Sequence, residues 1–272
     1  MRTRPNYVAG LAAFVWLLII GVPLYALVNT AVQPQTSYTD GGPVSIPSHL
    51  TLDNFATVID SGFLHYIWNT IFVAAFTVAI VLLLGIPISY AVVRGRGWLT
   101  RGVFRLFLVG LAIPSQAVII PLFLIINRLN LYDSLWGIIL PTAAFALPVT
   151  VLVLSGGMRD IGTELYEAMA LDGASPARVL RELVIPMSRP SIATACVFTA
   201  LQAWNGFLFP LIMTQSEDDK LVTLGLYNFV SQYGANVPAL LAAVLMSAAP
   251  ILVVYLFARR ALVAGLMGAG GK

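Results

Sequence analysis

Residues 158–190, MRDIGTELYEAMALDGASPARVLRELVIPMSRP, decide how the rest of the chain is organised. Nine of these residues are charged, whereas long apolar stretches flank them on both sides. Glu164 and Glu167 fall in the first turns of an expected helix, where acidic side chains favour the positive end of the helix dipole. Gly173 ends that helix, and the Ser-Pro pair at 175–176 begins a second one. We therefore expect a charged helix–turn–helix that a membrane protein presents to a soluble partner.

Composition places the chain among integral membrane proteins. Hydrophobic residues make up 59% of the 272 residues and charged residues only 10%, and the mean hydropathy is +0.89. The single cysteine, Cys196, excludes an intrachain disulfide and a cysteine metal cluster. His49 and His65 are too few for a zinc site. We therefore expect no metal site and no catalytic residues.

Six windows without Asp, Glu, Lys, Arg or His are long enough to cross about 30 Å of hydrocarbon, which takes roughly 20 helical residues. We expect an all-α membrane protein with six transmembrane helices in a single domain over residues 1–272. The expected helices lie near 8–29, 68–92, 105–127, 136–157, 191–213 and 237–258, and the charged loop covers 159–190. The first run could instead be a signal peptide, since Arg2 and Arg4 precede it, but it is long and contains Pro23.

Prolines and one polar segment predict departures from straight helices. Pro114 and Pro121 fall within the expected third helix, and each removes a backbone hydrogen bond and crowds the preceding turn. We therefore expect a kink in that helix. Residues 221–236, LVTLGLYNFVSQYGAN, are only partly amphipathic and are expected to form a loop segment before the last span.

The distribution of Lys and Arg predicts the orientation. Of the 15 basic residues, only Arg128 and Lys220 lie outside the N-terminus, the loop at 94–105, the charged stretch and the C-terminal tail. By the positive-inside rule, both termini and the charged stretch are cytoplasmic. The excess of basic over acidic residues therefore reflects the membrane topology, and nucleic acid is a poor candidate partner.

The apolar spans also restrict the kind of transport. All formal charges can be placed in loops, tails or helix edges, whereas ion-coupled carriers usually keep buried carboxylates or histidines. A transporter without such residues contains its own ATPase, uses an ATPase on another polypeptide, or moves a neutral solute passively. The tail GLMGAGGK lacks the first Gly and the final Ser or Thr of a phosphate-binding loop. An ATP-driven transporter with this sequence therefore needs a motor on another polypeptide.

The charged stretch resembles a known motif. EAMALDGA at 167–174, followed by Ile185-Pro186, is similar to the EAA loop of membrane subunits of binding-protein-dependent ABC importers. Further similarity covers nearly the whole chain, in NFATVIDSGFLHYIWNT (54–70), PISYAVVRGRG (87–97), ALQAWNGFLFPL (200–211) and ARRALVAGLMGAGGK (258–272). Together these segments resemble the smaller six-helix permease of maltose-type carbohydrate importers. The chain departs from the family pattern at Met169, which is usually Ala, and at Gly206, where sugar permeases often have an acid.

The resemblance implies a role for the charged stretch. In the family, the EAA helices sit in a cleft of a separate ATPase subunit and move as ATP closes its dimer. Carried over to this sequence, the coupling residues are Glu167, Ala168, Asp172, Gly173 and Pro186. Glu167 is expected to pair with a cation on the ATPase, which binds the ATP and Mg²⁺, so this chain needs no cofactor. The alternative, for a charged loop taken alone, is that these charges only solvate the loop.

The resemblance also implies partners, substrate and location. The partners are a second homologous permease, two copies of a cytoplasmic ATPase and an extracytoplasmic solute-binding protein that delivers a sugar. The location is the bacterial cell (inner) membrane, with this chain spanning the lipid several times.

The expected fifth helix contains candidate substrate-path residues. Gln202, Trp204 and Asn205 could offer hydrogen bonds and an aromatic face to a neutral sugar without the cost of a buried charge. The alternative is that the amides join helices and Trp204 only packs. Three other functions stay open, namely a permease for another polar solute, an ATP-independent carrier or channel, and a scaffold that recruits a cytoplasmic partner.

Overall fold

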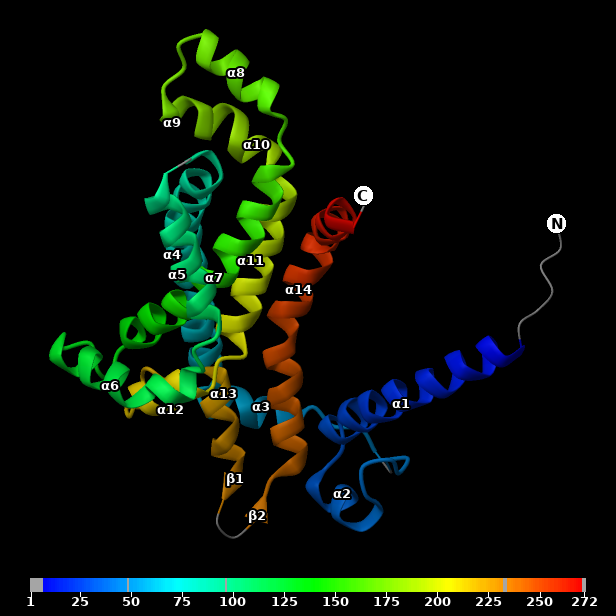
Figure 1. The fold of residues 1–272 in the computed structure, drawn as a ribbon. Coiled ribbons are helices and arrows are strands. Elements are labelled where there is room, and N and C mark those ends of the chain that lie inside the picture. Colours follow the sequence, from blue (N-terminus) through cyan, green and yellow to red (C-terminus); the bar gives the residue numbers. More distant parts are fainter. Residues whose placement is uncertain (1–6, 48, 96, 232–233, 271–272) are drawn as a thin grey trace. The chain divides into compact units, whose positions relative to one another are not determined.

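The computed structural model describes residues 7–47, 49–95, 97–231 and 234–270 (Figure 1). Arg2, Arg4, Arg96 and Lys272, which contributed to the expected orientation, lie outside the described residues. The chain forms two compact units. Unit 1 comprises Met1–Leu64 with Gly225–Pro250, and unit 2 comprises His65–Leu224 with Ile251–Lys272.

Unit 1 combines the N-terminal helices with the segment that precedes the last helix. Its elements are α1 (Tyr7–Ala31), α2 (Gln35–Gly41), α3 (Asp53–Asp60), η3 (Leu226–Phe229), β1 (Val230–Ser231), β2 (Gly234–Ala235) and the first part of α14 (Val237–Gly270). The Asn54 side-chain amide donates to the carbonyls of Ala31 and Gln33, both at 2.9 Å, and thereby fixes α3 to the end of α1. The two strands are antiparallel, with Val230 opposite Ala235. The expected loop at 221–236 therefore contains short helical turns and a small β-hairpin.

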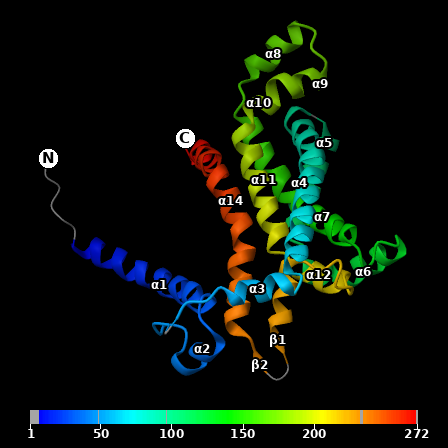
Figure 2. The ribbon, with the colours of Figure 1, turned by 180° about the vertical axis from the view of Figure 1, so that it is seen from behind.

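Unit 2 holds most of the remaining helices (Figures 1 and 2). Its elements are α4 (Phe63–Arg94, whose first two residues belong to unit 1), α5 (Trp98–Leu111), η1 (Ser115–Val118), α6 (Ile119–Arg128), α7 (Leu135–Arg159), α8 (Thr163–Leu171), α9 (Pro176–Val179), η2 (Leu180–Val184), α10 (Ile185–Met187), α11 (Arg189–Trp204), α12 (Leu208–Met213), most of α13 (Val222–Gly225) and the rest of α14. α7 and α11 lie side by side in both views. The predicted all-α fold is confirmed.

Small residues let the long helices of unit 2 approach one another closely. A Cβ added at Gly85 of α4 would lie 3.0 Å from Cγ2 of Thr150 on α7. The Thr150 and Thr199 hydroxyls, on α7 and α11, are 3.4 Å apart, and a side chain at Gly157 would overlap Ser191. Such small-residue contacts are typical of helices that pack within a membrane, where lipid supplies no hydrophobic drive for association.

The membrane-spanning segments differ from six straight helices. Among the described residues, α1, α4 and α7 are long and apolar enough to cross a membrane, and two bent helix pairs bring the possible spans to five. The expected single helix at 105–127 is instead α5 and η1–α6, at 97° to each other. Pro114 explains this break, because it has no N–H to donate and it disfavours helix at the residue before it.

The expected helix at 191–213 is also interrupted. α11 ends at Trp204 and α12 begins at Leu208, with Gly206 between them. The Asn205 side chain donates to the carbonyl of Leu201 at 2.8 Å, and the Asn205 backbone N–H donates to the same carbonyl at 3.0 Å. The sixth expected helix falls within α14, whose described apolar part is Val237–Val253. The count of six spans stays a prediction.

Candidate functional site

The charged stretch folds into a helical hairpin at one end of unit 2 (Figure 1). We call residues 163–187 the charged hairpin; α8 is its first arm, and α9, η2 and α10 form its second. Gly173 has φ 69°, a conformation that favours glycine. The Ala174 N–H donates to the carbonyl of Met169 at 3.0 Å, and the Gly173 N–H donates to that of Ala170 at 3.1 Å. This Schellman arrangement ends α8 where the sequence predicts.

The second arm begins with a side-chain cap. Ser175 accepts a hydrogen bond from the Arg178 N–H at 3.3 Å, and Pro176 occupies the first turn, where its missing N–H costs nothing. Arg178 also forms an ion pair with Glu182 at 2.8 Å, but both side chains are exposed, so the pair adds little stability. η2 is a single π-helical turn in the middle of this arm.

One face of the charged hairpin is fixed in the core of unit 2. Tyr166, Val179 and Val184 are buried in one cluster with Leu154 and Met158 of α7. Tyr166 is only 5% exposed. The hairpin is therefore packed as an extension of the helix bundle and is not a loose loop.

The opposite face of the hairpin is open to solvent. Four of the five predicted coupling residues are exposed, namely Glu167, Ala168, Asp172 and Gly173, and Pro186 is half-buried on the second arm. Asp172 and Gly173 lie at the turn, and Glu167 and Ala168 lie earlier on α8. Leu171, directly before this turn, is 90% exposed and was not among the predicted residues. The available signal was an apolar residue directly before the Asp-Gly turn.

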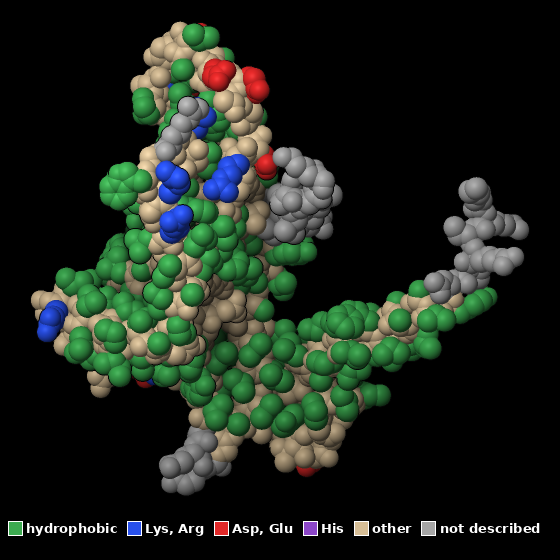
Figure 3. All heavy atoms as spheres, viewed as in Figure 1, with side chains coloured by type: hydrophobic (Ala, Val, Ile, Leu, Met, Phe, Trp, Pro, Cys, Tyr) green, Lys and Arg blue, Asp and Glu red, His purple; other side chains and the backbone are tan. Residues whose placement is uncertain are grey.

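Acidic and basic side chains gather over different elements at this end of unit 2. Figure 3 shows acidic side chains over α8 and basic side chains around the neighbouring ends of α4 and α5. The guanidinium of Arg94 lies over the Tyr166 ring, 4.2 Å from its centre, and that of Arg159 lies 5.3 Å from the centre of the Phe104 ring. Neither contact was predicted from the sequence.

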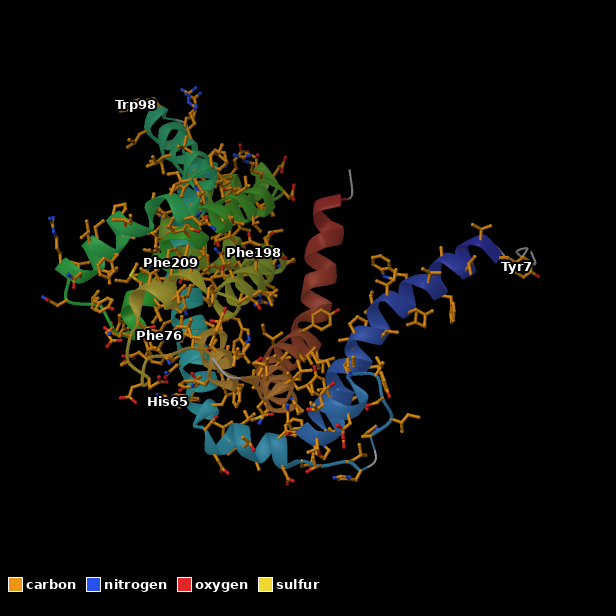
Figure 4. The ribbon with its side chains drawn as sticks, turned by 90° about the horizontal axis from the view of Figure 1, so that it is seen from below. Tyr7, His65, Phe76, Trp98, Phe198 and Phe209 are labelled. Carbon is orange, nitrogen blue, oxygen red and sulfur yellow. The ribbon has the colours of Figure 1, made fainter. Side chains whose placement is uncertain are left out.

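The predicted substrate-path residues surround the break between α11 and α12. Gln202 and Asn205 are exposed, whereas Trp204 is only 8% exposed and packs inside the chain. Phe198, labelled in Figure 4, is 45% exposed and lies one turn before Gln202 on the same face of α11. Phe198 therefore has an exposed aromatic ring, whereas Trp204 does not. The path role of Gln202, Trp204 and Asn205 stays a prediction.

A second ordered polar site lies at the far end of α7. Asp133 accepts hydrogen bonds from the N–H groups of Gln215 and Ser216 at 2.8 and 2.9 Å, and these bonds lower the pKa of its carboxyl. The Asn69 amide donates to the carbonyls of Asp218 and Lys220 at 2.7 and 3.0 Å. The loop between α12 and α13 is therefore held by side chains from α4 and from the segment that precedes α7.

The helical membrane fold and the charged hairpin define a transport component, and comparison with known proteins identifies the family. Residues 82–263 match the family described as binding-protein-dependent transport system inner membrane component, and the chain belongs to this family. It is thus a multi-pass membrane subunit of a transport system that depends on a binding protein, and it is not itself an enzyme.

Two relatives and one solved structure extend the comparison. The chain is 31% identical over 271 residues to the putative ABC transporter permease protein ORF2 of Caldicellulosiruptor sp., covering 100% of this chain and 98% of the relative. It is 31% identical over 259 residues to the diacetylchitobiose uptake system permease protein NgcG of Streptomyces coelicolor, covering 94% of this chain and 85% of the relative. A chain of a bacterial ABC transporter involved in the import of alginate has the same fold, with a TM-score of 0.79 and 22% identity over 96% of this chain and 98% of that chain.

Proposed function

We propose that this chain is one of two permease subunits that form the translocation pore of an ATP-driven importer for a neutral carbohydrate. The name of the Streptomyces relative, a diacetylchitobiose uptake permease, supports the substrate class. The amides of Gln202 and Asn205 are exposed at the break in a span, where neutral hydrogen-bonding groups suit sugar hydroxyls. The substrate is a sugar or oligosaccharide that an extracytoplasmic binding protein delivers.

The charged hairpin docks on a cytoplasmic ATPase in this proposal. The observation that carries it is the division of the hairpin into two faces: Tyr166 is fixed in the core with α7, while Glu167 and Leu171 are exposed and can meet a partner. A rigid element of this kind passes the motion of a soluble motor to the membrane helices. The complete importer contains a second homologous permease and two copies of the ATPase, which bind ATP and Mg²⁺. This chain needs no cofactor of its own.

The proposal also fixes the orientation. A hairpin that meets a cytoplasmic ATPase places the end of α7 near Arg159 on the cytoplasmic side of the bacterial cell (inner) membrane. Both termini are cytoplasmic in the same scheme. The distribution of the 15 Lys and Arg supports it, because thirteen of them fall on that side.

Co-purification with the native partners tests the docking role. We expect the ATPase to co-purify with the native chain. We expect Glu167→Arg to lose the ATPase, although this variant still inserts in the membrane. Glu164→Arg is the matched control, since it makes the same charge change on the same helix outside the predicted coupling residues. Retention of the ATPase by Glu167→Arg would contradict the docking role, and absence of the ATPase from the native preparation would favour a carrier or a scaffold.

Transport assays separate the remaining alternatives. In proteoliposomes that contain the whole complex, sugar uptake should require both ATP and the binding protein. Uptake without ATP would identify a secondary carrier. An EAA-type permease for another polar solute is the nearest alternative, and it would show ATP-dependent uptake of that solute with no uptake of any sugar in a panel of mono- and oligosaccharides.

A further inference from the structure

α4 packs against the cluster that anchors the charged hairpin, although the chain does not connect α4 and the hairpin directly. Four residues of α4 lie at three- and four-residue steps, and so on one helix face, and pack against the cluster that includes Tyr166: Leu82, Ile86, Tyr90 and Val93. The last helical residue, Arg94, then reaches over the hairpin itself. By contrast, α7 and α11 are joined to the hairpin through the chain at Arg159 and Arg189.

The contact between Arg94 and Tyr166 depends on the aromatic ring. The guanidinium carbon lies 4.2 Å from the ring centre, which is the geometry of a cation–π interaction. The Tyr166 hydroxyl is buried and has no hydrogen-bond partner among the described residues. A hydrogen bond from this hydroxyl therefore does not explain the position of the Tyr166 side chain. Burial raises the pKa of Tyr166, and the charge of Arg94 opposes that shift only in part. The ring is therefore neutral near pH 7, and the contact is not an ion pair.

We propose that Arg94 and Tyr166 are positioning residues that fasten α4 to the charged hairpin, so that a displacement of the hairpin moves α4 together with α7 and α11. The proposal rests on the proposed function and adds a third helix to the path from the motor to the pore. Without this contact, the hairpin can tilt over the end of α4, and part of the motion is lost. ATP is then hydrolysed without a matching movement of the solute path.

The test uses variants that distinguish the effects of the Tyr166 ring and the Arg94 charge from the effect of side-chain volume. Tyr166→Leu removes the ring but keeps an apolar side chain, and Tyr166→Phe keeps the ring but removes the unpartnered hydroxyl. Arg94→Gln removes the charge, and Arg94→Lys keeps it. Arg101→Gln is the matched control, because Arg101 is exposed on the neighbouring α5 and makes no such ring contact in the described part of the chain.

The measurement is the amount of ATP hydrolysed per sugar molecule transported by the complete importer in proteoliposomes. We expect this ratio to rise about fivefold for Tyr166→Leu and for Arg94→Gln, which corresponds to about 1 kcal/mol and is typical of a cation–π contact. The ATPase should co-purify normally with both variants. Tyr166→Phe, Arg94→Lys and Arg101→Gln should keep the native ratio. The double variant Arg94→Gln/Tyr166→Leu should be no worse than either single variant, because the two residues act through one contact.

Two outcomes would overturn the inference. One is a native ratio for both Tyr166→Leu and Arg94→Gln; the other is loss of the ATPase from both, which would mean that the contact shapes the docking surface. If Tyr166→Leu does not fold, the ratio measured for Arg94→Gln decides whether the inference holds, since Arg94 is exposed at a helix end. Failure of the proposed function gives a different result, namely no ATPase and no ATP-dependent uptake with the native chain.

Discussion

At the scale of single residues, the conformation of Gly173 sets the shape of the charged hairpin. Its φ of 69° penalises any residue with a Cβ, yet an added Cβ would meet no atom within 4 Å. The cost of Gly173→Ala is therefore one of backbone conformation alone, about 1 kcal/mol. We expect faster hydrogen exchange of the Ala174 amide in this variant and weaker co-purification of the ATPase.

A second glycine supplies the control for this prediction. Gly102 on α5 also has open space around an added Cβ, but its φ is not positive. Gly102→Ala should thus leave the hairpin unchanged and slightly favour its own helix. Gly173→Asn should fall between native and Gly173→Ala, because Asn tolerates the left-handed conformation better than Ala does. Equal effects of Gly173→Ala and Gly102→Ala would contradict the argument.

At the scale of elements, Asp133 controls the order of the loop between α12 and α13. Hydrogen bonds from the backbone N–H groups of Gln215 and Ser216 lower the pKa of Asp133. A carboxyl with a lowered pKa in the folded state stabilises that state above its unfolded pKa near 4, and this stabilisation is lost as the pH falls through the folded value. We therefore expect the Gln215 and Ser216 amides to lose protection from hydrogen exchange below about pH 4.

The pKa shift of the neighbouring Asp219 has the opposite sign, and it does not interfere with the exchange measurement at Gln215 and Ser216. Its pKa is raised, chiefly by burial and next by the charge of Asp133, so its ionisation disfavours the folded loop and acid relieves that cost. The Gln215 and Ser216 amides, however, donate directly to Asp133. Asp133→Asn should remove the acid-dependent step at these two amides, and an unchanged step in that variant would refute the assignment.

The elements also show which parts of the fold the sequence could predict. The hairpin ends were predictable because Gly173 and the Ser-Pro pair at 175–176 act locally through the backbone. Pro114 predicted a kink, but the 97° angle depends on how α6 packs with α12, which is distant in sequence. The contact of Arg94 with Tyr166 escaped prediction for the same reason, since it joins side chains from two separate segments.

The exposure of an aromatic ring near the candidate substrate path could not be predicted from the sequence. Trp204 was a candidate because of its aromatic ring, but burial is a tertiary property, and the structure places that ring inside the chain at 8% exposure. The i, i+4 relation between Phe198 and Gln202 was available in the sequence. It would have indicated which aromatic residue shares a face with an exposed amide.

At the scale of the whole molecule, α7 separates the two ordered polar sites of unit 2. Ser134 caps its first turn next to Asp133, and Arg159 ends it at the charged hairpin. α7 has 25 residues, so it is about 37 Å long, enough to cross about 30 Å of hydrocarbon. The hairpin and the loop at 214–221 should therefore lie on opposite sides of the membrane, as a transporter with a motor on one side and solute delivery on the other requires.

Labelling of introduced cysteines checks this separation. Cys196 is the single native cysteine, so Cys196→Ala gives a background in which Asp172→Cys and Asp218→Cys each report one site. A maleimide that cannot cross the membrane should label Asp218→Cys from outside intact cells, and should label Asp172→Cys only in inverted vesicles. The Cys196→Ala background without an added cysteine is the control for unspecific labelling. Both positions reacting from the same side would refute α7 as a single crossing, and the division of motor and solute sites between its two ends would then fail.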